Sequence, residues 1–181
     1  MTIYNTISAN SLNFNSYMKL YEQAFPADER RETADLIRVI KNCREFKIIE
    51  AVDGNTFLGF FTYWDFSDCG FAYGEHFAIE PEARNGGIGA RFLHHIISSL
   101  DVPLIIEVEL EDTPMACRRV KFYERMGLKA WRNVSYTQPP YSPGKAPVPL
   151  MLMTTEGFSS EAQVQEAARV LHRRAYGIAD K

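Results

Sequence analysis

Arg84-Asn85-Gly86-Gly87-Ile88-Gly89 joins a strand-like run, Phe77–Ile79, to a helix-like run over residues 90–97. A glycine-rich turn at the start of a helix leaves backbone N–H groups without partners, and the helix dipole adds partial positive charge there. Glycines also remove the side chains that would keep a bulky anion away from the main chain. The stretch therefore predicts a turn that binds a diphosphate.

This turn differs from the common nucleotide-binding loops. It lacks the Gly-Lys-Ser/Thr ending of a phosphate loop and the first glycine spacing of a dinucleotide fingerprint. The acidic residue that would hold a ribose after a second strand is not clearly placed either. The pattern Arg-x-x-Gly-x-Gly instead resembles the pyrophosphate-binding signature of the GNAT superfamily, the acyl-CoA-dependent N-acyltransferases.

A second segment, Arg118–Leu128, resembles the other signature of that superfamily. It reads as a helix that carries Phe122-Tyr123 and ends in a turn at Gly127. The two signatures occur in the expected order and together span residues 71 to 131. The resemblance implies acetyl-CoA as cosubstrate and an N-acetyltransferase activity, but it does not identify the acceptor.

Composition limits the other possibilities. With 181 residues and 46% apolar content, the chain is long enough for one domain with a proper core. A net charge of −3 gives no general attraction to nucleic acid or membrane lipid. No segment approaches the length of a membrane span, and the start does not read as a signal peptide. The three cysteines are odd in number and lack metal-like spacing, so we expect a reduced, cytoplasmic protein without a metal. Exposed sheet edges and the aromatic-rich strand at 57–66 permit a homodimer as well as a monomer.

The order of predicted elements indicates an α/β fold. Helical spacing marks two early helices, at residues 17–24 and 36–43, before three antiparallel strands at 46–52, 56–66 and 71–80. A helix at 87–100, a strand at 103–110, a helix from 114 to 127 and strands at 129–137 and 148–154 follow. The whole chain, residues 1–181, is expected to be one domain with a mixed, mostly antiparallel sheet of about seven strands and an extra C-terminal helix at 159–176.

The resemblance implies where the cosubstrate lies. Backbone N–H groups of the turn would hold the diphosphate, with support from Arg84. A bulge in the strand would aim main-chain donors at the pantetheine arm and the thioester oxygen. The predicted cofactor-binding residues are thus Phe77, Ala78, Ile79, Arg84, Asn85, Gly86, Gly87, Ile88, Gly89 and Ala90. In this fold the strands near Ile79 and Leu104 diverge, and acyl-CoA lies in the gap between them.

Tyr123 stands where the superfamily's general acid usually lies. A phenol with a pKa near 10 can protonate a thiolate whose conjugate acid has a pKa near 8.5. The alternative is a core tyrosine, because Ala116, Val120 and Tyr123 share one helical face.

Glu75 is the predicted general base. Period-two alternation places it on a face with Phe71, Tyr73 and Phe77, where partial desolvation would raise its pKa. The alternative is a half-buried glutamate satisfied by a hydroxyl or a backbone donor. His76 is a second candidate, although it should face the other side unless a bulge intervenes.

The strand at 104–111 places Glu107, Glu109 and Glu111 on one face. Three buried carboxylates without partners would be prohibitively costly, so this face meets solvent, cations or a cleft. It is either an acidic wall that attracts a cationic amine and relays its proton, or a solvated strand end paired with nearby arginines. Glu107 is the residue most expected inside and is a catalytic candidate, whereas Glu109 is a substrate-binding candidate.

Tyr136 and Gln138 complete the predicted substrate-binding residues, because the segment 136–141 supplies aromatic and amide groups that could line an acceptor pocket. A rigid turn between the last two strands explains the prolines of this segment equally well. The leading hypothesis is direct attack of a small cationic amine on acetyl-CoA in a ternary complex. The alternatives are a non-catalytic module that senses acyl-CoA and a nucleotide-binding protein of another fold.

Overall fold

An eight-stranded mixed sheet runs through the computed structural model, which describes residues 2–178. The strands follow the order β1-β2-β3-β4-β5-β8-β6, and β7 pairs with β8. The β4–β5 pair is parallel, and the other pairs are antiparallel. The strands are β1 (Thr2–Thr6), β2 (Phe46–Asp53), β3 (Thr56–Phe66), β4 (Phe71–Ile79), β5 (Leu104–Glu109), β6 (Lys129–Ala130), β7 (Tyr136–Gln138) and β8 (Val148–Thr154).

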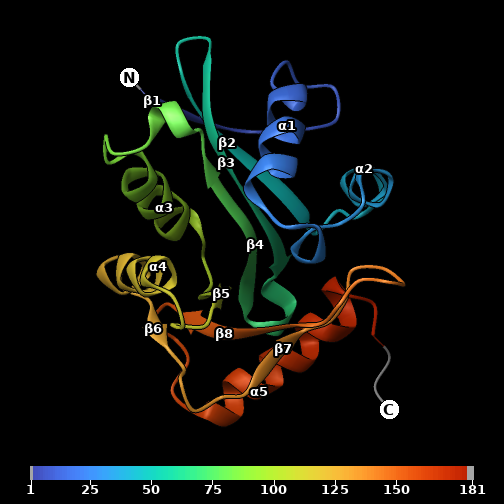
Figure 1. Cartoon of the computed structure of the whole chain (residues 1–181), viewed down its shortest axis with the longest axis vertical. Coiled ribbons are helices and arrows are strands. Elements are labelled where there is room, and N and C mark those ends of the chain that lie inside the picture. The colour runs from blue at the N-terminus through green and yellow to red at the C-terminus, as the bar shows by residue number, and fades with distance from the viewer. Residues whose placement is uncertain (1, 179–181) are drawn as a thin grey trace.

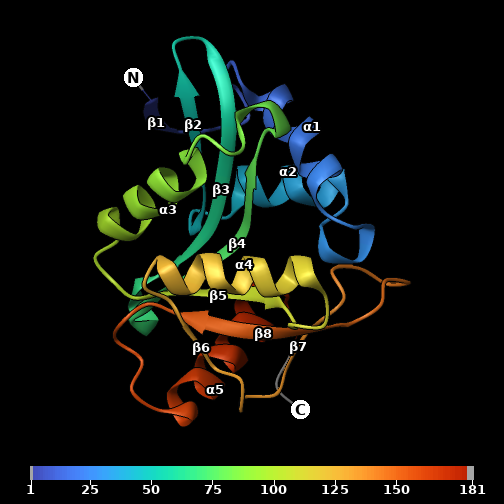
Figure 2. The ribbon, with the colours of Figure 1, turned by 60° about the vertical axis from the view of Figure 1, so that its left-hand side comes forward.

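Helices cover both faces of this sheet. Figure 1 shows α1 and α2 on one side of β2–β4 and α3 on the other, while Figure 2 shows α4 running along β5. The last helix, α5, lies at the end of the molecule formed by β7 and β8 (Figure 1). The helices are α1 (Phe14–Ala24), α2 (Thr33–Asn42), α3 (Ile88–Ser99), α4 (Pro114–Arg125) and α5 (Glu161–Val170), with short turns η1 (Ala27–Glu29), η2 (Ser67–Cys69), η3 (Pro81–Ala83) and the π-helical η4 (Leu171–Ala175).

Local chemistry fixes the ends of these helices. The hydroxyl of Thr113 accepts a hydrogen bond of 3.0 Å from the amide of Ala116, and Pro114 occupies the first turn of α4. Ser160 caps α5 in the same way through the amide of Gln163. The α1 helix ends just before Pro26, which has no N–H to continue it.

The sheet separates two apolar cores. One core includes Tyr17, Leu20 and Phe60, with contributions from α1, α2 and α5. The other includes Phe92 and Val120 and lies beneath α3 and α4. The predicted α/β class, with a mostly antiparallel sheet flanked by helices and an added C-terminal helix, is therefore confirmed.

Two details differ from the sequence prediction. The N-terminal strand β1 was not expected, since its five residues are mostly polar, yet it pairs with β2 as an edge. The expected strand at 129–137 is interrupted, because residues 131–135 leave the sheet between β6 and β7. With β1 added and the strand at 129–137 divided into β6 and β7, the six strands placed by residue range become the eight of the sheet, close to the expected total of about seven.

The divergence of β4 from β5 opens the middle of the sheet. Their pairing covers Ala72–Gly74 against Leu104–Ile106 and stops there. Beyond this point, His76–Ile79 stay paired with β3 on their other side, while Glu75 has no partner in that register. The two strands thus form the splayed pair that the resemblance implies.

Candidate active site

A cleft of about 540 Å³ occupies the gap between the diverging strands. The glycine turn reaches it through Arg84 and Gly89, and α4 contributes Phe122 and Tyr123. The segment from α1 to η1 lines the opposite part, together with Gln138 of β7. The cleft therefore brings both sequence signatures to one place.

The turn before α3 is open to solvent and lacks a side-chain cap. Gly87 stands at the helix start with φ +70°, and Asn85 also has a positive φ of 66°. The backbone N–H groups of the first helical residues, Ile88–Ala90, have no acceptor within the helix, because no helical turn precedes them. A Cβ at Gly87 would lie 3.1 Å from Nη1 of Arg91. A bare main chain with free donors at a helix start fits a diphosphate.

Two arginines support this turn from its ends. Nε of Arg84 donates a hydrogen bond of 2.9 Å to the Ile79 carbonyl, which ties the turn to the end of β4. Nη1 of Arg91 donates to the Gly86 carbonyl at 3.0 Å. Because these contacts use carbonyl groups of the main chain, they leave the amide side of the turn available to an anion.

The strand does carry a bulge, but its position differs from the prediction. Its register against β3 shifts between Thr62 and Tyr63, which leaves Glu75 as the extra residue, whereas Phe77–Ile79 pair regularly. The side chain of Glu75 has 0% exposure although the residue itself is partly exposed, so its exposed atoms belong to the main chain. The bulge thus turns main chain, rather than a carboxylate, toward the cleft.

The bulge also changes which side chains share a face. Phe71 and Tyr73 pack in the core beneath α1, as predicted, but Phe77 packs in the opposite core. His76 contacts the rings of Tyr21 and Phe25 and thus lies on the same side as Glu75. The alternation inferred from the sequence fails beyond Gly74 because one residue is inserted there.

The predicted rise in the pKa of Glu75 is wrong. Nη2 of Arg31 lies 2.7 Å from Oε1 of Glu75, and Nδ1 of His76 lies 3.6 Å from Oε2. Burial works to raise the pKa of this carboxyl, but the Arg31 guanidinium and His76 outweigh it and lower the pKa to about 2. A buried, paired carboxylate of this kind is a poor proton acceptor at neutral pH.

Glu107 lies inside the protein, as expected, and three phenols surround its carboxylate. Tyr73 and Tyr176 each donate to Oε2 at 2.7 Å, and Tyr136 donates to Oε1. Burial raises the pKa of Glu107, and the phenol hydrogen bonds offset only part of that rise. Glu107 therefore combines a place in the cleft lining with a raised pKa.

The other two glutamates of the predicted acidic face, Glu109 and Glu111, are each paired with an arginine. Glu109 lines the cleft and accepts a hydrogen bond from Arg119. Glu111 forms a salt bridge with Arg132 at 2.7 Å. Glu111 thus fits the solvated interpretation and Glu107 the cleft interpretation, whereas Glu109 combines a place in the cleft lining with the arginine pairing of the solvated one.

Sequence reasoning missed Glu29. This residue of η1 lines the cleft half-buried, and its backbone carbonyl lies 2.9 Å from Nε2 of His76. Burial raises the pKa of its carboxyl, and the charge of Glu109 adds to the rise. Its only signal in the sequence is its place after Pro26, which gives no indication of proximity to β5.

Tyr123 lines the cleft and is the residue of α4 that was predicted as the acid. Burial raises the pKa of its phenol to about 12, so the hydroxyl stays protonated across the neutral range. The residue is partly buried and also packs against the core beneath α3 and α4, so it has a place in that core as well as in the cleft lining.

Tyr136 and Gln138 are both buried, but they contact different parts of the site. The hydroxyl of Tyr136 faces Glu107, as described above. Nε2 of Gln138 donates to the Asp28 carbonyl at 3.2 Å and lines the cleft beside η1. Tyr141, in the following loop, donates to Oε1 of Glu75 at 3.2 Å.

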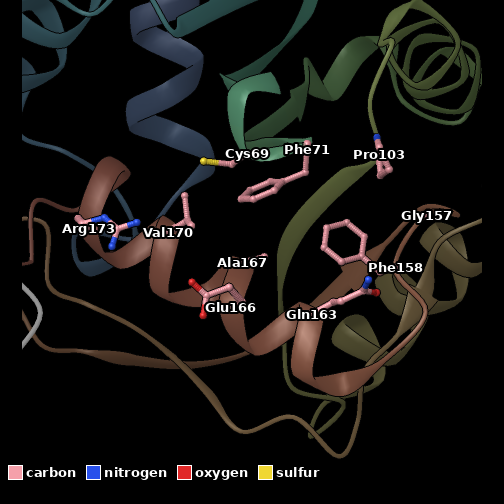
Figure 3. A pocket seen from close by; sticks show the side chains of 11 residues that line it. Cys69, Phe71, Pro103, Gly157, Phe158, Gln163, Glu166, Ala167, Val170 and Arg173 are labelled. Carbon is pink, nitrogen blue, oxygen red and sulfur yellow. The ribbon is translucent and has the colours of Figure 1, made fainter.

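A second cavity of about 430 Å³ lies away from both signatures. Figure 3 shows Phe71 and Phe158 facing the side of α5 that carries Gln163 and Glu166. This cavity shares no lining residue with the cleft. Within residues 2–178, no cluster of potential metal ligands is found, and no helix is long and apolar enough to cross a membrane.

Comparison with known proteins agrees with this geometry. Residues 44–129 match the family model described as the acetyltransferase (GNAT) domain. The chain is 34% identical to a protein from Bacteroides thetaiotaomicron that is assigned to the GNAT family of acetyltransferases, with 98% of this chain and 99% of that chain covered and a TM-score of 0.91. The chain belongs to the GNAT family. Among proteins with curated functions, none matches it.

More distant structures of the family share the fold. A GNAT acetyltransferase from Elizabethkingia anophelis with acetyl-CoA bound is 14% identical, with 86% of this chain and 97% of that chain covered and a TM-score of 0.59. An aminoglycoside 6′-N-acetyltransferase in complex with coenzyme A is 16% identical, with 84% and 96% covered and a TM-score of 0.61. The GNAT member described here thus has the fold of acyl-CoA-dependent N-acetyltransferases.

Proposed function

We propose that this GNAT protein transfers the acetyl group of acetyl-CoA to a primary amine by direct attack in a ternary complex. One observation carries the proposal: a single cleft joins the glycine turn, the exposed main chain of bulged β4 and the phenol of Tyr123. The turn fits a diphosphate because its glycine main chain is bare and its first helical N–H groups are free.

The cosubstrate would be held along this path. Amides of residues 85–90 would bind the diphosphate, and the main chain of Phe77–Ile79 would line the pantetheine arm. When bound, acetyl-CoA supplies an activated thioester. Backbone donors at the bulge are suited to polarise its carbonyl, because they are fixed before the reaction begins.

The chemistry needs one proton acceptor and one proton donor. A neutral amine nitrogen attacks the thioester carbon, so a C–N bond forms and the C–S bond breaks. The nitrogen proton passes to Glu107, directly or through water, and Tyr123 gives its proton to the departing sulfur. Water then returns a proton from Glu107 to the Tyr123 phenolate, which restores both groups and balances the reaction.

Glu107 replaces Glu75 as the proposed base. Its pKa is raised, whereas Arg31 keeps Glu75 ionised and occupied. Glu75 then has another use, since its pair with Arg31 fixes the bulged residue whose main chain faces the cleft. Tyr123 remains the proposed acid.

The acceptor is proposed to be a small cationic amine. Glu29, Glu107 and Glu109 line the cleft, and Arg119, which also lines it, is already paired with Glu109. A cation that enters the part of the cleft lined by these residues meets more carboxylates than positively charged side chains. We also propose a cytoplasmic location, because three free thiols suit a reducing compartment. The protein would act there as a monomer or a homodimer.

The test is turnover of acetyl-CoA with a panel of diamines, aminoglycosides, amino acids and short peptides, followed by release of free thiol. We expect thiol release with at least one small cationic amine and none with a neutral hydroxyl analogue. Calorimetry with CoA, ATP and NAD provides the binding control. Tight CoA binding without turnover on any amine would favour the sensing module, and preference for ATP or NAD would contradict the proposal outright.

A further inference from the structure

The Glu107 carboxylate collects hydrogen bonds from three separate parts of the chain. Tyr73 lies on β4, Tyr136 lies on β7, and Tyr176 directly follows η4. The hydroxyls of Tyr73 and Tyr176 also lie 2.8 Å apart. An ionised carboxylate can accept several donors, so this arrangement stabilises its charged form.

Tyr176 reaches this position because α5 ends in a π-helical turn. Its amide donates to the Leu171 carbonyl at 3.2 Å, a bond that spans five residues. The preceding carbonyl, that of Ala175, accepts a hydrogen bond of 2.8 Å from Nη2 of Arg31. The same turn therefore contacts Glu107 through Tyr176 and, by way of Arg31, the ion pair with Glu75.

The end of this helix is anchored independently of the site. Arg174 forms salt bridges of 2.7 Å with Asp68 and with Glu45, and its guanidinium lies 4.4 Å from the ring centre of Phe66. These contacts tie η4 to the end of the sheet where β3 meets β4. The phenol of Tyr176 is thus carried by a fixed turn rather than by a free terminus.

A second branch of the network connects the two buried carboxylates. The hydroxyl of Tyr141 lies 3.2 Å from Oε1 of Glu75 and 3.4 Å from the hydroxyl of Tyr176. The titratable and charged groups around Glu107 are Tyr73 and Glu75 on β4, Tyr136 on β7, Tyr141 in the loop after it and Tyr176 after η4, with Arg31 and His76 beyond Glu75 and His172 beside Tyr136.

We propose that Tyr176 is a positioning residue for the Glu107 carboxylate, so that the C-terminal segment completes the acceptor end of the cleft. This inference rests on the proposed function, in which Glu107 accepts the proton of the amine. The segment lies outside residues 44–129, which the family model matches. The site of this chain therefore depends on residues beyond the part that carries both signatures.

The physical consequence has a definite sign. A phenol that donates to the ionised carboxylate lowers the pKa of Glu107, so removal of that phenol raises it. The loss of one hydrogen bond to a charged group corresponds to a shift of about one pH unit. The base would then lose its proton only at higher pH, while the ring that packs against Tyr141 and Tyr73 would remain in place.

The first test reads the carboxylate directly. The ¹³C carboxyl resonance of Glu107 is identified by its loss in Glu107→Gln and titrated in the wild type, Tyr176→Phe and Tyr176→Met. We expect an upward shift of about one pH unit in both Tyr176 variants. The matched control is Tyr17→Phe, which removes a buried hydroxyl without a hydrogen-bond partner among the described residues. An unchanged midpoint in the folded Tyr176 variants, or an equal shift in Tyr17→Phe, would overturn the inference.

The second test separates this inference from the proposed function. If Glu107 is the base, the acid limb of kcat/KM moves upward in Tyr176→Phe by the same amount as the carboxyl midpoint, so that the rate one unit below the wild-type midpoint falls about tenfold. The affinity for CoA stays within about twofold, because Tyr176 does not contact the glycine turn. A shifted midpoint with an unmoved limb contradicts the base role of Glu107 and leaves the positioning supported. Wild-type protein without turnover contradicts the proposed function, while the carboxyl titration still decides the inference.

Discussion

Nη2 of Arg31 lies 2.7 Å from Oε1 of Glu75, and their side chains are 9% and 0% exposed. The two residues are 44 positions apart, and their pair holds the bulged residue of β4 against the turn that follows η1. A buried pair of this kind adds little stability over a well-packed apolar pair, but loss of one partner leaves a charge without compensation. Two predictions about stability depend on this relationship.

We expect Arg31→Met to lower the free energy of unfolding by about 3–5 kcal/mol, because it leaves the Glu75 carboxylate buried and unpaired. The double variant with Glu75→Gln should recover much of this loss. Urea denaturation measures both. The control is Arg38→Met, which removes an exposed partner of Asp35 and should cost less than about 1 kcal/mol. Equal losses at the two arginines would contradict the role of the buried pair.

The same pair predicts how stability depends on pH. The pKa of Glu75 is lowered in the folded state to about 2. The ionised carboxylate therefore stabilises the folded state fully above its unfolded pKa, and this stabilisation is lost as the pH falls through about 2. A depression of about two units corresponds to roughly 3 kcal/mol. We therefore expect the difference in unfolding free energy between wild type and Glu75→Gln to shrink between about pH 4.5 and pH 2. A difference that stays constant over this range would show that Arg31 does not hold the pKa down.

The sequence predicts much of the fold because its signals are local. A helix cap such as Thr113 and a stop such as Pro26 act within a few residues, and their helices lie where the sequence places them. The edge strand β1 carries no such signal, because its residues are mostly polar and its pairing with β2 is distant in sequence.

The candidate site is predictable only where a motif carries it. The glycine turn and Tyr123 lie at one cleft because both belong to recognisable signatures. The state of Glu75 depends on Arg31, and that of Glu107 depends on Tyr176, which approaches from the far end of the chain. Alternation along a single strand cannot reveal such distant partners, nor the inserted residue that turns Phe77 to the other face.

The glycine turn gives a prediction with a closely matched control. Gly87→Ala should weaken CoA binding by about tenfold or more, because a Cβ strains a residue at φ +70° and presses on Nη1 of Arg91, which supports the turn. Gly54→Ala introduces comparable strain at φ +58°, in a hairpin with no atom within 4 Å of the added Cβ. Calorimetry with CoA should therefore show a loss for the first variant only. A parallel loss in both variants would indicate general destabilisation rather than contact with the cosubstrate.

Tyr123→Phe tests the proposed acid. Loss of the phenol proton should lower kcat by about 10²–10⁴-fold, because the sulfur must then leave as an unprotonated thiolate. CoA affinity should change little, since the ring remains in the cleft. Tyr63→Phe is the control, as Tyr63 is a half-buried phenol on β3 outside the cleft lining. Because burial raises the pKa of Tyr123 to about 12, the wild-type rate should show no decline from this group up to about pH 10. Unchanged kcat in Tyr123→Phe, measured by thiol release at saturating amine, would assign the proton transfer to another donor.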